Sequence, residues 1–174
     1  MAYLKNDVIK LRALEMADVP FLYAMENDAS AWNAGSNVQP FSHQTLRAYV
    51  ESQQGDVFAD KQLRLVVCLN GSDSPVGLVD LYDFSPRHQH AWVAVMTDSK
   101  HREKGIAQMA LNLLADYAFN FLHIRMLMAV VAADNEASLH LFKSAGYVQC
   151  GLFPNYYLRA SSAVDAVCFQ LSAK

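Results

Sequence analysis

The chain has 174 residues, a length that fits one domain slightly above the commonest size. Hydrophobic residues make up 53% and charged residues 18%, which favours a sizeable core and argues against global disorder. The formal net charge is -3 and the isoelectric point is near 6.0, so nucleic-acid binding is not expected as the main task. We therefore expect one domain over residues 1–174.

The apolar segments and the cysteines indicate in which cellular compartment the protein is expected. The first residues carry no apolar signal core, and the longest apolar run, 126–133, is far shorter than the ~18 residues that a membrane helix needs. Cys68, Cys150 and Cys168 are far apart and form no C-x-x-C pair, which fits free thiols in a reducing compartment. The expectation is a cytoplasmic protein with no membrane partner.

The first part of the chain predicts a short strand and two helices. Residues 8–12 alternate between apolar and polar side chains as a strand does. Asp18 is placed to cap a helix that has Pro20 in its first turn, and Ser42 is placed to cap the next one. Three strands are then expected at 63–69, 76–84 and 91–97. Their short connecting turns favour antiparallel hairpins.

The second part predicts a crossover unit. From Gly105 to Leu122, the polar residues recur every four positions, so a mostly buried helix with one narrow polar stripe is expected. These polar residues are Gln108, Asn112, Asp116 and Asn120. The continuous apolar run 126–133 is typical of a strand covered on both faces. Strand, helix and buried strand in this order predict a right-handed crossover between parallel strands.

The end of the chain predicts one more helix and two strands. Asp134 or Asn135 can cap the helix, and Gly146 can end it. The last strands are expected at 147–152 and 164–171. Together the segments predict an α/β fold, with a mixed central sheet of about six or seven strands and helices on both faces.

The loop from Asp98 to Lys104 is the strongest candidate for a binding site. It connects a predicted strand to the start of the long helix, where unpaired backbone N–H groups and the helix dipole favour an anion. Gly105 allows close approach of a ligand, while Arg102 and Lys104 add positive charge. The pattern R-x-x-G-x-A is short, and an ordinary connection remains an alternative.

The segment from Val95 to Ala107, followed by residues 134–147 (DNEASLHLFKSAGY), resembles the GNAT superfamily of N-acetyltransferases. Within it, the chain is similar to the branch with spermidine and ribosomal-protein N-acetyltransferases. The resemblance covers nearly the whole chain and implies acetyl-CoA as the cofactor. It also implies an amine acceptor and, since dimers are common among similar proteins, a possible homodimer.

The resemblance further implies which residues hold the cofactor. The loop would bind the pyrophosphate through its backbone, the strand before it would contact the pantetheine arm, and the later helix would complete the groove. The implied residues are Arg102, Glu103, Lys104, Gly105, Ile106 and Ala107 in the loop, Val95 and Met96 in the strand, and Asn135, Ser138, Phe142 and Lys143 in the later segment.

Amine acetylation needs a proton acceptor and a proton for the leaving thiolate. Asp80, with Glu26 and Asp83 behind it, is the candidate base or amine-binding carboxylate; a solvated strand face or a structural ion pair is the alternative for Asp80.

The usual acid of the family is a tyrosine that corresponds here to Phe142, which has no proton to give. Tyr147 is the proposed substitute, and Tyr156 and Tyr157 are further candidates. Each can instead be a packed aromatic side chain. Solvent protonation of the thiolate and loss of catalysis are the other possibilities.

No metal site is expected, because His88 and His90 have no third ligand nearby in the sequence. The expected activity is direct acetyl transfer to a primary amine, such as that of a polyamine. The alternatives are acetylation of a protein N-terminus or lysine, and a non-catalytic acyl-CoA-binding module.

Overall fold

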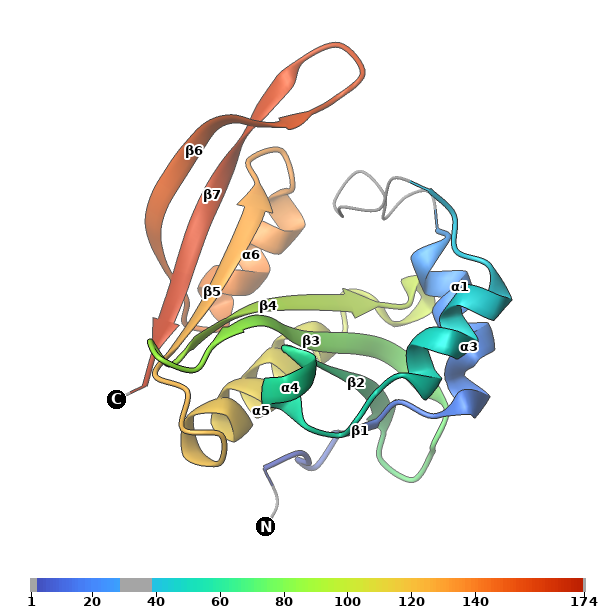
Figure 1. Ribbon diagram of the computed structural model, residues 1–174. Coiled ribbons are helices and arrows are strands. Elements are labelled where there is room, and N and C mark those ends of the chain that lie inside the picture. The colour runs from blue at the N-terminus through green and yellow to red at the C-terminus, as the bar shows by residue number, and fades with distance from the viewer. Residues whose placement is uncertain (1–2, 29–38, 174) are drawn as a thin grey trace.

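The structure, a computed structural model, describes residues 3–28 and 39–173. Its centre is a seven-stranded sheet in the order β1-β2-β3-β4-β5-β7-β6 (Figure 1). All neighbouring strands are antiparallel except β4 and β5, which are parallel. The strands are β1 Ile9–Ala13, β2 Gln62–Leu69, β3 Pro75–Ser85, β4 His90–Thr97, β5 Met126–Ala132, β6 Val148–Leu158 and β7 Ala163–Ser172. The predicted mixed sheet is confirmed.

Helices lie on both faces of this sheet, also as predicted. Two hydrophobic clusters separate the layers: one packs α5 and α6 against one face, and the other packs α1 and α3 against the opposite face. The helices are α1 Val19–Glu26, α3 His43–Glu51, α4 Val57–Asp60, α5 Ile106–Asn120 and α6 Glu136–Ser144, with 3-10 turns at Met16–Asp18 and Ser99–His101. The short α4 has no counterpart among the predicted elements. No helix within the described ranges has both the length and the apolar character to cross a bilayer.

The helix ends largely follow the sequence. Ser42 caps α3 by accepting a hydrogen bond from the Thr45 N–H, and Asn135 caps α6 by accepting one from the Ser138 N–H. Asp18 occupies the N-cap position of α1, but its carboxylate binds Arg12 instead of the helix N–H groups. A charged partner makes a stronger hydrogen bond than a neutral backbone donor, which explains this difference.

The parallel pair β4–β5 is short. Pairing runs only from His90↔Met126 to Trp92↔Met128, although β4 continues to Thr97 and β5 to Ala132. Beyond Trp92 the two strands separate, with β5 rising beside β7 while β4 stays beside β3 (Figure 1). Within residues 3–28 and 39–173, the edge of β4 from Val93 to Thr97 therefore has no strand partner on that side, and its backbone groups are available to a ligand.

Strand β5 differs from the sequence prediction. Leu127, Ala129 and Val131 are buried in the core with α5, but Met128 and Val130 on the opposite face are only half-buried. The expectation of a strand covered on both faces is therefore wrong in part. Helices α1 and α3 contact the other end of the sheet, so they do not cover this half of β5.

The terminal hairpin is longer than predicted. Strand β6 extends to Leu158 and is the edge strand of the sheet, with bulges between Gln149 and Gly151 and between Phe153 and Tyr157. Bulges add residues that break the regular alternation, which hides such a strand from pattern analysis.

Candidate active site

A cleft of about 1110 Å³ lies beside the part of β4 that β5 no longer pairs. Five segments converge on it: the end of β4, the loop and first turn of α5, one face of α6 with the residues just before it, the end of α1, and the residue that follows β6. Nine of the residues expected at the cofactor site line this cleft: Val95, Met96, Arg102, Glu103, Gly105, Ile106, Ala107, Asn135 and Ser138. The structure thus brings together two segments that lie about 30 residues apart in the sequence.

Gly105 forms the turn that leads into α5. It has a φ of 73°, in the left-handed region that glycine adopts without strain, and it is the N-cap residue of the helix. No side chain of the described segments caps this helix, so N–H groups of its first turn remain for a ligand facing the cleft. A ligand phosphate placed here would also meet the positive end of the helix dipole.

The charged side chains of the loop are held by the backbone. Arg102 is exposed and donates to the Thr97 carbonyl at 3.4 Å, while Lys104 donates to the Lys100 carbonyl at 2.9 Å. Lys104 does not line the cleft, which corrects one expectation. Its ammonium instead satisfies a carbonyl of the 3-10 turn behind the loop, and thereby steadies the loop.

Asn135 has two roles in this geometry. Its side-chain oxygen accepts the Ser138 N–H at 3.1 Å, which fixes the start of α6. The same residue lines the cleft, so its side-chain NH₂ group is oriented by the cap and can donate to a ligand. On the neighbouring helix, Gln108 donates to the Ser144 carbonyl at 2.7 Å and ties the start of α5 to the end of α6.

Sequence reasoning missed Arg159, which lines the cleft from the end of β6. Its guanidinium binds both carboxylate oxygens of Asp134, at 2.9 and 3.0 Å, and lies over the ring of Tyr157. Arg159 and its partner Asp134 thus form the charged part of the wall next to Asn135. An isolated arginine 25 residues after Asp134 carries no spacing signal, and only the β6–β7 hairpin brings it here.

Two other expected cofactor residues do not reach the cleft. Phe142 is buried in the core, where its ring packs edge-to-face on Tyr147 with centroids 5.1 Å apart. Lys143, the next residue on α6, is exposed and is not among the residues of the cleft wall. Successive positions on a helix point about 100° apart, and the α6 face that lines the groove is centred on Ala137, Leu141 and Ser144, so Phe142 and Lys143 point away from it.

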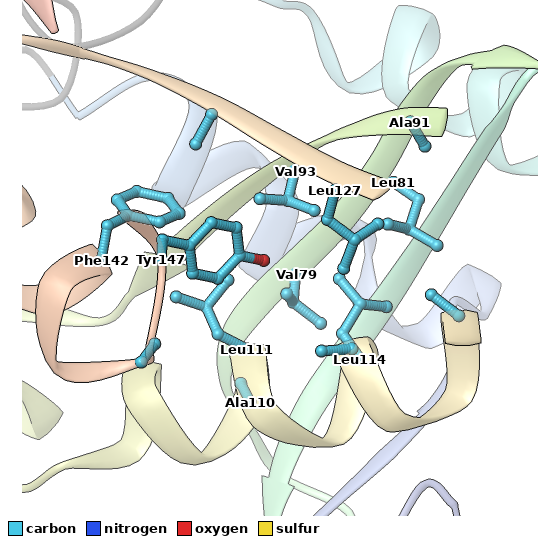
Figure 2. Close-up of a cluster of buried hydrophobic side chains, with 14 of the residues drawn as sticks. Val79, Leu81, Ala91, Val93, Ala110, Leu111, Leu114, Leu127, Phe142 and Tyr147 are labelled. Carbon is cyan, nitrogen blue, oxygen red and sulfur yellow. The ribbon is translucent and has the colours of Figure 1, made fainter. Parts of the chain in front are cut away.

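Tyr147 is also a core residue. Figure 2 shows its hydroxyl pointing into the apolar cluster near Leu111, Val93 and Leu127. The hydroxyl oxygen is buried and has no hydrogen-bond partner among the described residues, and burial raises the pKa of Tyr147 well above its usual value. A group with such a pKa and no contact with the cleft is not placed to protonate a thiolate, so the proposed acid role is not supported by this geometry.

The two candidate carboxylates meet at a third residue, Arg64 on β2. Its Nε and Nη2 atoms donate to Asp80 at 2.6 and 3.2 Å, and its Nη1 atom donates to Glu26 at 2.5 Å. The side chains of Arg64, Glu26 and Asp80 are only 16%, 9% and 5% exposed. Asp80 therefore has the ion-pair partner that the sequence left open as an alternative. Burial raises the pKa of Asp80, against the opposing effect of Arg64.

Comparison with known proteins agrees with this architecture. The acetyltransferase (GNAT) domain family matches residues 9–148. Spermidine N(1)-acetyltransferase of Escherichia coli (strain K12) is 26% identical over 168 residues, which cover 93% of this chain and 86% of the relative. Two solved structures share the fold. Spermidine N-acetyltransferase from Vibrio cholerae, in complex with CoA and spermine, superposes with a TM-score of 0.86 at 23% identity over 96% of each chain. Ribosomal-protein-S5-alanine acetyltransferase from Vibrio fischeri gives a TM-score of 0.83 at 17% identity over 97% of this chain and 94% of its own.

The chain belongs to the GNAT acetyltransferase family and is an N-acetyltransferase. GNAT acetyltransferases use acetyl-CoA as the acetyl donor. The residues present fit that donor. The cleft combines N–H groups in the first turn of α5, a glycine that lets a ligand come near the backbone, and the part of β4 that β5 does not pair.

Proposed function

We propose that this protein, as one domain over residues 1–174, transfers an acetyl group to a primary amine of a small cationic molecule such as a polyamine. The observation that carries the proposal is the continuity of the cleft. It extends from the loop at Gly105 along the open edge of β4 to Met25 and Asp28 at the end of α1. An acetyl donor held at the loop would thus present its thioester toward the α1 end.

The charges at the α1 end favour a cationic acceptor. Asp28 lines the cleft, and Glu26 follows Met25 directly in the chain. The relatives of E. coli and V. cholerae are named for spermidine, a polyamine. In this proposal Asp28, which lines the cleft, is the carboxylate that binds the ammonium, while Glu26 and Asp80, which are outside the cleft wall, act behind it through Arg64.

The chain's own groups would act mainly by positioning. Acetyl-CoA supplies an activated acetyl group as a thioester. The α5 loop and the wall residues Arg159 and Asn135 would hold the charged part of the donor, and the backbone of Val95 and Met96 would orient the carbonyl. The amine nitrogen then forms the C–N bond as the C–S bond breaks, and one proton leaves the nitrogen.

The proton for the thiolate would come from solvent in this proposal. None of the described residues that line the cleft is a tyrosine, and Tyr147 is enclosed in the core. Thiols ionise near pKa 8.5, so a thiolate is a fair leaving group even without a dedicated acid.

The protein is further proposed to self-associate through β6, and to reside in the cytoplasm, where its three free cysteines would stay reduced. Half of the large hydrophobic side chains exposed in the described chain lie on this edge strand: Val148, Leu152, Phe153, Tyr156 and Leu158. No charged residue interrupts them, and such edges invite pairing. A spermidine N-acetyltransferase from V. cholerae has been solved as a dodecamer.

The test is an acceptor screen. The protein is incubated with acetyl-CoA and with polyamines, amino acids, or peptides that carry a free N-terminus or lysine, and release of free thiol is followed. The proposal predicts the fastest acceptor-dependent release with polyamines. Faster release with peptides would replace the small amine by a protein acceptor. Binding of acetyl-CoA without release for any acceptor would overturn the proposed reaction.

A further inference from the structure

Arg64 is a charged residue that joins several elements on the α1 side of the sheet. It lies on β2 directly opposite Asp80 of β3, so the two side chains share one face. The guanidinium donates to Asp80 through Nε and Nη2, and its Nη1 donates to Glu26, the last residue of α1. The ring of Tyr49 on α3 lies over the same guanidinium, 5.6 Å from its carbon. One side chain thus links β2, β3, α1 and α3.

This junction lies beside the cleft. Across the sheet, Asp80 is opposite Ala94 of β4, and Met96 lies two residues further along the same face. Met96 lines the cleft and packs against the cluster that contains Met25. The end of α1 is therefore held between the Arg64 junction on one side and the acceptor part of the cleft on the other.

Buried charged side chains are stable only when the geometry of their hydrogen bonds is good. Three charged side chains that are 5–16% exposed lose most of their hydration, and only close, correctly angled hydrogen bonds compensate for that loss. Arginine satisfies two carboxylates at once because its donors form a rigid planar fork, which lysine lacks. The position of Glu26 is thus set by the fork.

We propose that Arg64 is a positioning residue for the acceptor side of the cleft: anchored by Asp80, it fixes Glu26 and the last turn of α1, and so places Met25 and Asp28 in the cleft wall. Asp80 acts in this arrangement as the anchor of Arg64, not as the group that meets the amine. The proposal rests on the proposed amine acetylation and names the device that shapes its acceptor site.

The chain offers a matched control in a second buried ion pair. Arg12 binds both oxygens of Asp18 at 2.7 Å, and the two side chains are 21% and 4% exposed. This pair lies on β1 and at the start of α1, and neither residue lines the cleft. Arg12→Lys therefore disturbs a similar buried arginine–carboxylate ion pair at the opposite end of α1.

The experiment compares Arg64→Lys with Arg12→Lys by two readouts. In the first, Arg64→Lys is expected to raise the KM for the amine about tenfold, with the Kd for acetyl-CoA within about twofold of the wild-type value. Arg12→Lys is expected to change neither constant. The second readout is hydrogen exchange of the backbone amides of Met25 and Glu26, which should become faster in Arg64→Lys only.

The following results would reject the positioning role of Arg64. Equal effects of both variants on the KM and on exchange, or an equal loss of acetyl-CoA affinity and amine affinity in Arg64→Lys, would reject the positioning role. If the wild-type protein acetylates no amine, the proposed function fails, but exchange at the end of α1 still decides whether Arg64 holds it. Should Arg64→Lys not fold, Glu26→Gln weakens only one arm of the fork, and unchanged exchange in that variant would overturn the inference.

Discussion

Gly105 offers the sharpest test of the cofactor assignment, through the substitution Gly105→Val. The residue has a φ of 73°, and a Cβ added there would meet no atom of the described residues within 4 Å. The free chain should therefore accommodate the side chain sterically, at the cost of left-handed strain, about 1–2 kcal/mol. That corresponds to a fall in Tm of about 2–8 °C for a domain of this size.

Binding should suffer far more than stability. The added isopropyl group would stand in the cleft at the N-terminal turn of α5, where the N–H groups face the ligand. We expect the Kd for acetyl-CoA to rise at least about a hundredfold, equivalent to about 2.8 kcal/mol. Isothermal titration calorimetry with CoA and acetyl-CoA measures this directly.

Gly71→Val is the matched control. Gly71 lies in the β2–β3 turn with a φ of 82°, and it too has no atom within 4 Å of an added Cβ. It should lower the Tm by a similar amount and leave the Kd unchanged, because it is absent from the cleft wall. The reasoning is refuted if Gly105→Val binds acetyl-CoA like the wild type, or if both variants lose affinity equally.

Three further predictions concern other parts of the molecule. Tyr147→Phe removes a buried hydroxyl that has no partner in the described part of the chain, so stability should stay equal or rise by up to about 1 kcal/mol and kcat should not change. A large fall in kcat would restore the acid role. For Asp18, burial acts to raise the pKa, but the hydrogen bonds from the Arg12 guanidinium and the Glu15 N–H outweigh it and hold the pKa below its usual value. This carboxylate stabilises the fold above its unfolded pKa, and that contribution is lost as pH falls through the lower folded value. Urea unfolding should therefore show Asp18→Asn much weaker than wild type at pH 7, with a gap that narrows below about pH 4; a constant gap would contradict the assignment. Leu158→Glu, at a side chain that is 85% exposed, should reduce the mass of the assembly in sedimentation velocity without loss of stability, whereas Val8→Glu should not.

Much of the fold was predictable because local patterns and tertiary contacts agree. In α5 a polar residue recurs every four positions, and Asn112, Asp116 and Asn120 of this series are exposed, as the periodicity indicates. Ser42 and Asn135 cap their helices because capping needs only residues within three positions in the sequence.

The assignments that failed concern side-chain direction and long-range partners. Asp80 in mid-strand left open a functional carboxylate, a solvated strand face and a structural ion pair, because its partner Arg64 becomes its neighbour only when β2 and β3 pair. Phe142 and Tyr147 follow a family motif in sequence, and yet the packing of α6 turns both rings into the core. Arg159 enters the site only through the β6–β7 hairpin.

By itself, the sequence determined the mixed sheet, the crossover helix and the loop at Gly105. These depend on periodicity, capping and turn chemistry, which act over a few residues. Only the tertiary structure decided that β4 and β5 separate after Trp92, that Arg64 ties Glu26 to Asp80, and that Tyr147 is enclosed in the core. These features arise from contacts between residues far apart in the chain. A polar group that such contacts bury needs a partner within the protein, whereas one left at the cleft can bind the ligand.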